Sequence, residues 1–86
     1  MTFEQRIKNI AFSGDTMKVR FSDGVEVEVP VSNFPRLLTA TSSQRNNWEL
    51  IGRGIGVHWD GIDEDLSVEN ILLAYSRDRK DSYALA

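Results

Sequence analysis

The sequence contains no cysteine, a single histidine and only two prolines. Without cysteine there is no disulfide framework, no thiolate nucleophile and no cysteine zinc site. One histidine cannot supply the three-histidine ligand set of a catalytic zinc site. The longest uninterrupted apolar run, Ile71 to Tyr75, is far shorter than the about 20 residues that a membrane helix needs. We therefore expect no cofactor, no metal and no membrane association.

Basic residues are also in the minority, because 10 Lys and Arg stand against 13 Asp and Glu, for a net charge of -3. Nonspecific affinity for nucleic acid comes mostly from neutralising phosphates with Lys and Arg, so this composition argues against nucleic acid as a partner. The first six residues lack the apolar core and the small-residue cleavage site of a secretory signal. Together with the lack of cysteine, this leads us to expect a cytoplasmic protein.

At 86 residues the chain is long enough for one small domain, which can spare few large residues from its core. From Ser76 onward the composition changes to charged and polar residues. We expect a single α+β domain over residues 1–76 and a charged, flexible tail over residues 77–86.

The opening third shows the period of two that is typical of strands with one buried face. Met17, Val19 and Phe21 alternate with polar residues, and the alternation resumes after Asp23-Gly24. Asp-Gly between two alternating runs predicts a hairpin with a type I′ turn. With an earlier apolar segment over residues 7–12, this predicts a three-stranded antiparallel meander.

The middle and end of the chain carry helix and hairpin signals. Thr41 with Gln44 three residues later matches a capping box, and Ser67 is a plausible N-cap for an apolar stripe. We therefore predict a fold in which the meander is followed by two short helices (33–40 and 42–47), a β-hairpin (48–51 with 55–59) and a C-terminal helix (68–75).

Four carboxylates, on Asp60, Asp63, Glu64 and Asp65, lie within six residues. Their spacing does not match the ligand positions of an EF-hand loop, which argues against a calcium site. They are better explained as charges that complement the N-terminus of the following helix. A partner-facing acidic patch is the second interpretation.

His58 is next to Trp59 in a predicted strand, so the two side chains point to opposite faces. An acid/base pair of His58 with Asp60 or Asp63 would suit a small hydrolase. The sequence has no serine in an elbow motif of the type G-x-S-x-G, and a structural or surface histidine is the favoured interpretation.

The segment Gly52-Arg53-Gly54 lies between two predicted strands and not between a strand and a helix. It therefore predicts a hairpin loop and not a dinucleotide-binding loop. Trp48 and Trp59 are expected in the core, with base-stacking platforms as the alternative.

Several short motifs occur together in the order found in one bacterial family. They are F-x-D-G (Phe21, Asp23, Gly24), F-P-R-L (Phe34 to Leu37), A-T (Ala40-Thr41), Gln44-Arg45, Asn47-Trp48, I-G-x-G (Ile51, Gly52, Gly54), His58-Trp59 and D-E-D-L-S (Asp63 to Ser67). The combination, spread over residues 7 to 74, resembles the domain of unknown function family 2442. The resemblance implies a small α+β domain. Members are often encoded beside another short uncharacterised protein, an arrangement similar to a toxin–antitoxin pair, and no catalytic residues come with the family.

We therefore predict a noncatalytic protein-interaction module, antitoxin-like or regulatory, that binds a protein partner from a neighbouring gene or forms a homo-oligomer. The polar members of the motifs are the expected partner-binding residues: Arg36, Arg45, Arg53, His58, Asp63, Glu64 and Asp65. Internal pairing of Arg36 or Arg45 with Asp63 or Glu64 is an equal alternative. A nucleic-acid-binding regulatory domain would instead require the three arginines to share one face away from the carboxylates.

Overall fold

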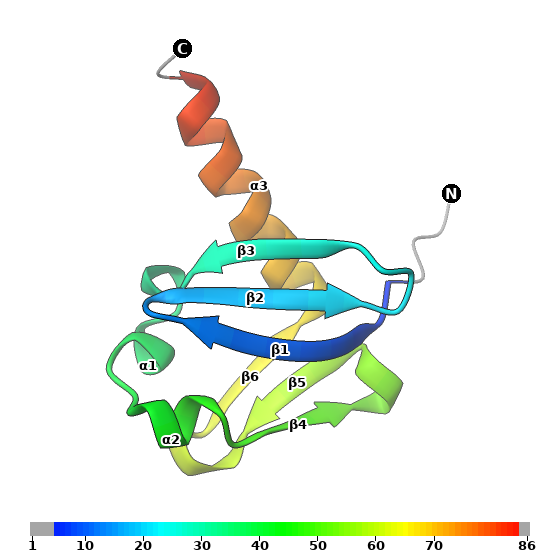
Figure 1. Ribbon diagram of the computed structural model, residues 1–86, viewed down its shortest axis with the longest axis vertical. Coiled ribbons are helices and arrows are strands. Elements are labelled where there is room, and N and C mark those ends of the chain that lie inside the picture. Colours follow the sequence, from blue (N-terminus) through cyan, green and yellow to red (C-terminus); the bar gives the residue numbers. More distant parts are fainter. Residues whose placement is uncertain (1–4, 85–86) are drawn as a thin grey trace.

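The protein consists of two three-stranded antiparallel sheets, short helical turns between them and a long C-terminal helix (Figure 1). The computed structural model describes the backbone of residues 5–84 and the side chains of residues 5–78. The predicted α+β class is confirmed.

The N-terminal sheet has the strand order β1-β2-β3, with β1 at Ile7–Ser13, β2 at Thr16–Phe21 and β3 at Glu26–Pro30. Met17 lies opposite Val29 and Val19 opposite Val27, and all four are buried. On the other face Arg20 forms an ion pair with Glu26 at 2.6 Å. The predicted meander, with one apolar and one wet face, is confirmed.

The turn between β2 and β3 differs from the predicted type I′ turn. Only Gly24 has a positive φ, of 91°, and Asp23 does not. The Phe21 amide donates to the Val25 carbonyl at 2.8 Å, and the Val25 amide donates to the Asp23 carboxylate at 3.1 Å. This is a three-residue loop with glycine at its left-handed position, so the hairpin was predicted correctly but its turn was not.

Two short helices follow, as predicted, and both are shorter than expected. The capping box is present, because the Gln44 amide donates to the Thr41 hydroxyl at 3.1 Å and the Thr41 amide to the Gln44 side chain at 2.9 Å. The helical elements are η1 (Val31–Asn33), α1 (Pro35–Leu38) and α2 (Ser42–Arg45).

The C-terminal sheet has the order β4-β5-β6, with β4 at Trp48–Ile51, β5 at Gly56–Trp59 and β6 at Glu64–Ser67. The turn η2 (Gly52–Gly54) joins the first two strands and η3 (Asp60–Ile62) the last two. The sequence analysis predicted the β4-β5 hairpin but missed β6. The short charged segment Glu64–Ser67 has a single apolar residue, so its pairing with β5 leaves little periodic signal.

Helix α3 covers Val68–Ala84. Its predicted cap is confirmed, since the Asn70 amide donates to the Ser67 hydroxyl at 3.0 Å. The helix continues past residue 75, where the sequence analysis ended it. Residues 85–86 and the side chains from residue 79 onward lie outside the described part of the chain, so the flexibility of the tail stays a prediction.

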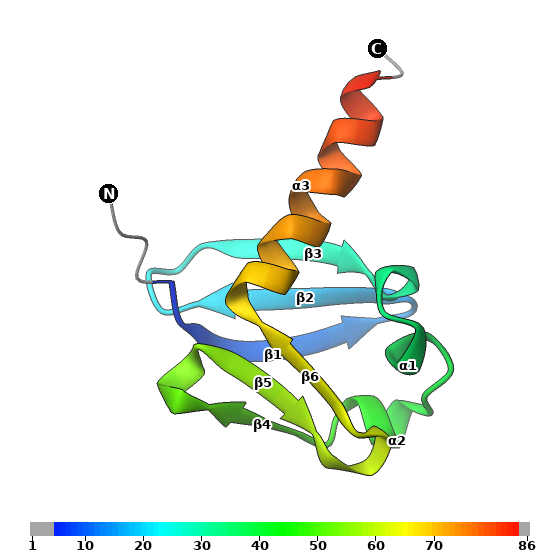
Figure 2. The same cartoon turned by 180° about the vertical axis from the view of Figure 1, so that it is seen from behind.

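One core joins all of these elements. Residues of both sheets and of α3 belong to a single buried cluster, which includes Phe21, Val57, Trp59, Leu66 and Ile71. Helix α3 packs against β3 and β6 before it projects beyond the sheets (Figure 2). Within the described residues, no helix is both long and apolar enough to cross a membrane.

Candidate functional site

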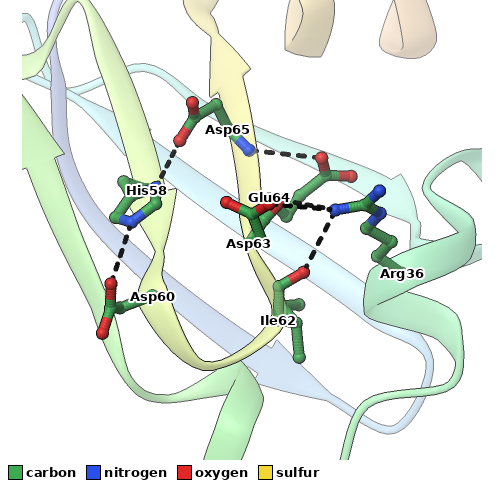
Figure 3. A network of polar contacts seen from close by, with 7 residues as sticks. All are labelled: Arg36, His58, Asp60, Ile62, Asp63, Glu64 and Asp65. Atoms are coloured by element: carbon green, nitrogen blue, oxygen red, sulfur yellow. Dashed lines mark hydrogen bonds and ion pairs between the residues drawn. The ribbon is translucent and has the colours of Figure 1, made fainter.

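Five of the seven predicted contact residues gather where β5 turns into β6: Arg36, His58, Asp63, Glu64 and Asp65. Figure 3 shows two groups there, one around His58 and one around Arg36. They are linked along β6, where the Asp65 amide donates to the Glu64 carboxylate at 3.2 Å. Asp63, Glu64 and Asp65 thus each contact another residue of this chain.

His58 lies between two carboxylates on the outer face of the C-terminal sheet. Nδ1 contacts the Asp65 carboxylate across the β5-β6 pair, and Nε2 lies 3.4 Å from the Asp60 carboxylate. The hydrogen bond with Asp65 is the main cause that raises the pKa of His58 above its ordinary value of 6.5, and Asp60 adds to it against an opposing effect of partial burial. With an acceptor at each ring nitrogen, the imidazolium form fits this site.

Trp59, the neighbour of His58, points the other way and is fully buried. Its indole Nε1 donates to the Arg45 carbonyl at 2.9 Å. The predicted opposite orientation of His58 and Trp59 is therefore confirmed, as is the core position of Trp59. Trp48 is half-buried and packs against the same core.

Arg36, on α1, holds the turn that precedes β6. Its Nη1 donates to the Asp63 carbonyl at 2.6 Å and lies 3.8 Å from the Asp63 carboxylate. Asp63 has a φ of 52°, a left-handed conformation that aspartate tolerates better than most residues. The alternative in which Arg36 pairs internally with Asp63 is thus the arrangement found, although both side chains are largely exposed.

The favoured interpretation of the acidic segment was that its charges complement the N-terminus of α3. The structure shows a different arrangement. Asp60 lies in η3, Asp63 directly after it, and Glu64 and Asp65 in β6. Ser67 and Asn70 cap the helix instead. Among the described residues, no group of three or more His, Asp or Glu side chains is arranged to hold a metal ion.

Arg45 is buried and has a structural role instead of the predicted contact role, with 9% of its surface exposed. Its guanidinium donates to the carbonyls of Leu37 at 2.9 Å, Leu38 at 3.1 Å and Gly14 at 3.0 Å. It also pairs with Asp15 at 3.2 Å. These bonds tie the end of α1 to the β1-β2 turn.

Arg53 lies in η2, at the end of β5 opposite to η3, with a φ of 62°. Its exposed side chain has no hydrogen bond or ion pair with any described residue. The predicted hairpin loop is confirmed here. Since Arg45 is buried and Arg36 lies beside Asp63, the three arginines do not share the single basic face that the nucleic-acid alternative requires.

Exposed apolar side chains lie on β4 and directly after the η2 turn. Leu50, Ile51 and Ile55 are 39%, 41% and 52% exposed, and they make up half of the large exposed apolar side chains in the described chain. Strand β4 pairs with β5 on one side only, and no element lies beyond its other side in either view (Figures 1 and 2). Its backbone groups on that side are open to another strand.

The sequence analysis did not name this edge or the Asp65 partner of His58. Adjacent apolar residues such as Leu50 and Ile51 point to opposite faces of a strand, so both can be buried only if both faces are covered. That signal was present in the sequence. The pairing of His58 with Asp65 was not visible, because it depends on β6.

Two comparisons with known proteins found a family or a structure that this chain resembles. The family described as "Protein of unknown function (DUF2442)" matches residues 7–76. A crystal structure of a protein of unknown function from Rhodospirillum rubrum ATCC 11170 superposes with a TM-score of 0.72 at 25% identity, over 83% of this chain and 88% of that one. No curated protein matches.

Proposed function

This chain is a member of the DUF2442 family, and from that premise and the open edge of β4 we propose that it is a noncatalytic protein-interaction module with a regulatory or antitoxin-like role. The observation that carries the proposal is the exposed apolar surface of β4 and the adjacent loop. A partner strand would bury this surface and bond the open backbone groups in one step.

The polar residues support a noncatalytic role. Each ring nitrogen of His58 faces a carboxylate of this chain, and among the described residues no hydroxyl nucleophile contacts the imidazole. Asp63, the other acid considered for a hydrolase, lies with Arg36. The bonds of His58 and Arg36 hold the η3 turn and β6 beside β5.

The proposed partner is a protein in the cytoplasm, encoded by a neighbouring gene or identical to this chain. Exposed apolar side chains on an edge strand suit a protein surface better than nucleic acid, which is bound mostly through its phosphates.

Affinity purification from the native host tests this function. Tagged wild-type protein should retain a stoichiometric protein at moderate salt, identified by mass spectrometry, or should elute as an oligomer. Ile51→Lys places a charge on the edge strand. This variant should neither retain the protein partner nor form an oligomer, because native edge strands use lysine to prevent pairing.

Leu73→Lys is the matched control, since Leu73 is 58% exposed on α3 and away from β4. This variant should behave like the wild type. A monomer that retains only nucleic acid, released by salt, would contradict the proposal.

A further inference from the structure

We infer that three side chains, those of Arg36, Glu64 and Asn70, prevent another strand from pairing with the edge of β6. Strand β6 is the second edge of the C-terminal sheet, because the strand order is β4-β5-β6. An open edge presents unpaired amide and carbonyl groups, with which the edge of another chain can pair. This edge lies on the side of the sheet opposite to β4, so its protection does not depend on the proposed function.

The hydrogen bonds between β5 and β6 show which backbone groups of β6 point away from β5. The Val68 amide donates to the Ile55 carbonyl at 3.0 Å, so these two residues are a hydrogen-bonded pair at the end of the ladder. Bonded and non-bonded pairs alternate in an antiparallel ladder. Ser67 and Asp65 come one and three residues before Val68, so both are in non-bonded pairs. Their amides therefore point away from β5, where an added strand would bond to them.

Side chains of the same chain already bond to both of these amides. The Glu64 carboxylate accepts from the Asp65 amide at 3.2 Å, as Figure 3 shows. The Asn70 side chain accepts from the Ser67 amide at 2.9 Å, which completes a capping box with the Ser67 hydroxyl. An added strand would have to displace both side chains.

Arg36 covers the start of the same edge from α1. Its Nη1 donates to the carbonyls of Asp63 at 2.6 Å and Ile62 at 3.4 Å, so the side chain crosses the residues just before β6 (Figure 3). The edge is thus covered at its beginning, its middle and its end. The strand is also short and carries two carboxylates, and natural edge strands use both features to avoid pairing.

Two triple variants test this role. The variant R36A/E64A/N70A removes all three side-chain bonds, whereas R36K/E64Q/N70D keeps a donor or an acceptor at each position. Both variants have the net charge of the wild type, because each loss of a charge is balanced within the variant. In sedimentation velocity over about 10 to 500 µM, the alanine variant should form larger species as its concentration rises, with an average mass at least about twofold above that of the matched variant.

Any association through β4 is common to the two variants and cancels in the comparison. Circular dichroism shows whether both are folded. Equal average masses for two folded variants, whether both are monomeric or both associate, would overturn the inference.

Glu64 alone provides a second test, which holds even if the triple alanine variant does not fold. Glu64→Ala and Glu64→Gln remove the same charge, but only glutamine keeps an oxygen that can accept from the Asp65 amide. Hydrogen exchange of this amide, followed by NMR, should be at least about threefold faster in the alanine variant, which should also associate more strongly. Equal exchange rates, or faster exchange without any gain in association, would contradict a protective role of Glu64.

Discussion

At the scale of single residues, Arg45 shows how a charged side chain becomes part of a core. Its long aliphatic stem is buried and its guanidinium lies 5.9 Å from the centre of the Phe12 ring. The carbonyls that it bonds belong to the last turn of α1 and to the β1-β2 turn, so this side chain links two backbone segments that are far apart in the sequence. A planar group with several donors is needed to reach them together.

Arg45→Lys is therefore expected to lower the free energy of unfolding by about 2 kcal/mol, because an ammonium cannot replace several charged hydrogen bonds at once. Urea denaturation followed by tryptophan fluorescence measures this. Arg36→Lys, at an exposed site, should cost less than about 1 kcal/mol. Equal stability of the two variants would show that Arg45 is not a structural residue.

His58 provides a second test, on pH. Since the pKa of His58 is raised in the folded state, its interaction with Asp65 and Asp60 stabilises the fold fully below pH 6.5, the ordinary value, while both carboxylates are ionised. The stabilisation is lost as the pH rises through the pKa of the folded state. His58→Gln should flatten the dependence of the unfolding free energy on pH in this range.

NMR titration of the imidazole should give a pKa above 6.5. Asp65→Asn should lower that pKa more than Asp60→Asn does, because the hydrogen bond of Asp65 is the larger cause. A His58 pKa at or below 6.5 in the wild type would disprove the arrangement.

At the scale of elements, the η2 loop positions the β4 edge. Gly54 has a φ of 98°, and a Cβ there would collide with the backbone of Ile7 in β1. The Arg6 side chain donates a hydrogen bond to the carbonyl of Gly52, in the same loop, at 3.3 Å. The end of the hairpin is thus held against the start of the N-terminal sheet, which keeps β4 at the border of the molecule.

Gly54→Ala should destabilise the protein by about 2 kcal/mol or more, because alanine is strained at this φ and rigid backbone opposes its Cβ. Gly61→Ala is the matched control, with no atom within 4 Å of the added Cβ, and should change stability little. Thermal unfolding of the two variants gives the comparison. A Gly54→Ala protein as stable as the control would mean that this close approach does not exist.

At the scale of the whole molecule, two sheets that could be separate units share one buried cluster. Val57, Trp59 and Leu66 of the second sheet belong to the same cluster as the valines of β2 and β3. Each sheet has only three strands, and the buried side chains of each complete the core of the other. The two should therefore unfold together.

We expect one transition in urea, in which different probes give the same midpoint. Tryptophan fluorescence reports on the C-terminal sheet, which contains Trp48 and Trp59, and the amide NMR signals of Val19 and Val27 report on the N-terminal sheet. Midpoints that differ beyond error would show two independently folding units.

The sequence by itself determined the elements whose signals are local. The alternation around Val19, the Asp23-Gly24 hairpin, the capping box of Thr41 and the cap of Ser67 depend on neighbours a few residues away, and all four are found in the structure. Even there the predicted type I′ turn was wrong, since the backbone conformation of Asp23 depends on the exact loop length.

Tertiary structure alone decided the features that depend on distant segments. Strand β6 exists because β5 offers it a partner, and only that pairing brings Asp65 to His58. Arg45 is buried because α1 and the β1-β2 turn meet around it, and the turn residues Gly14 and Asp15 precede it by 31 and 30 residues. The exposure of β4 has the same origin: the sheet order places it at an edge, and a strand pattern specifies which face a side chain takes but not which strand lies beside it.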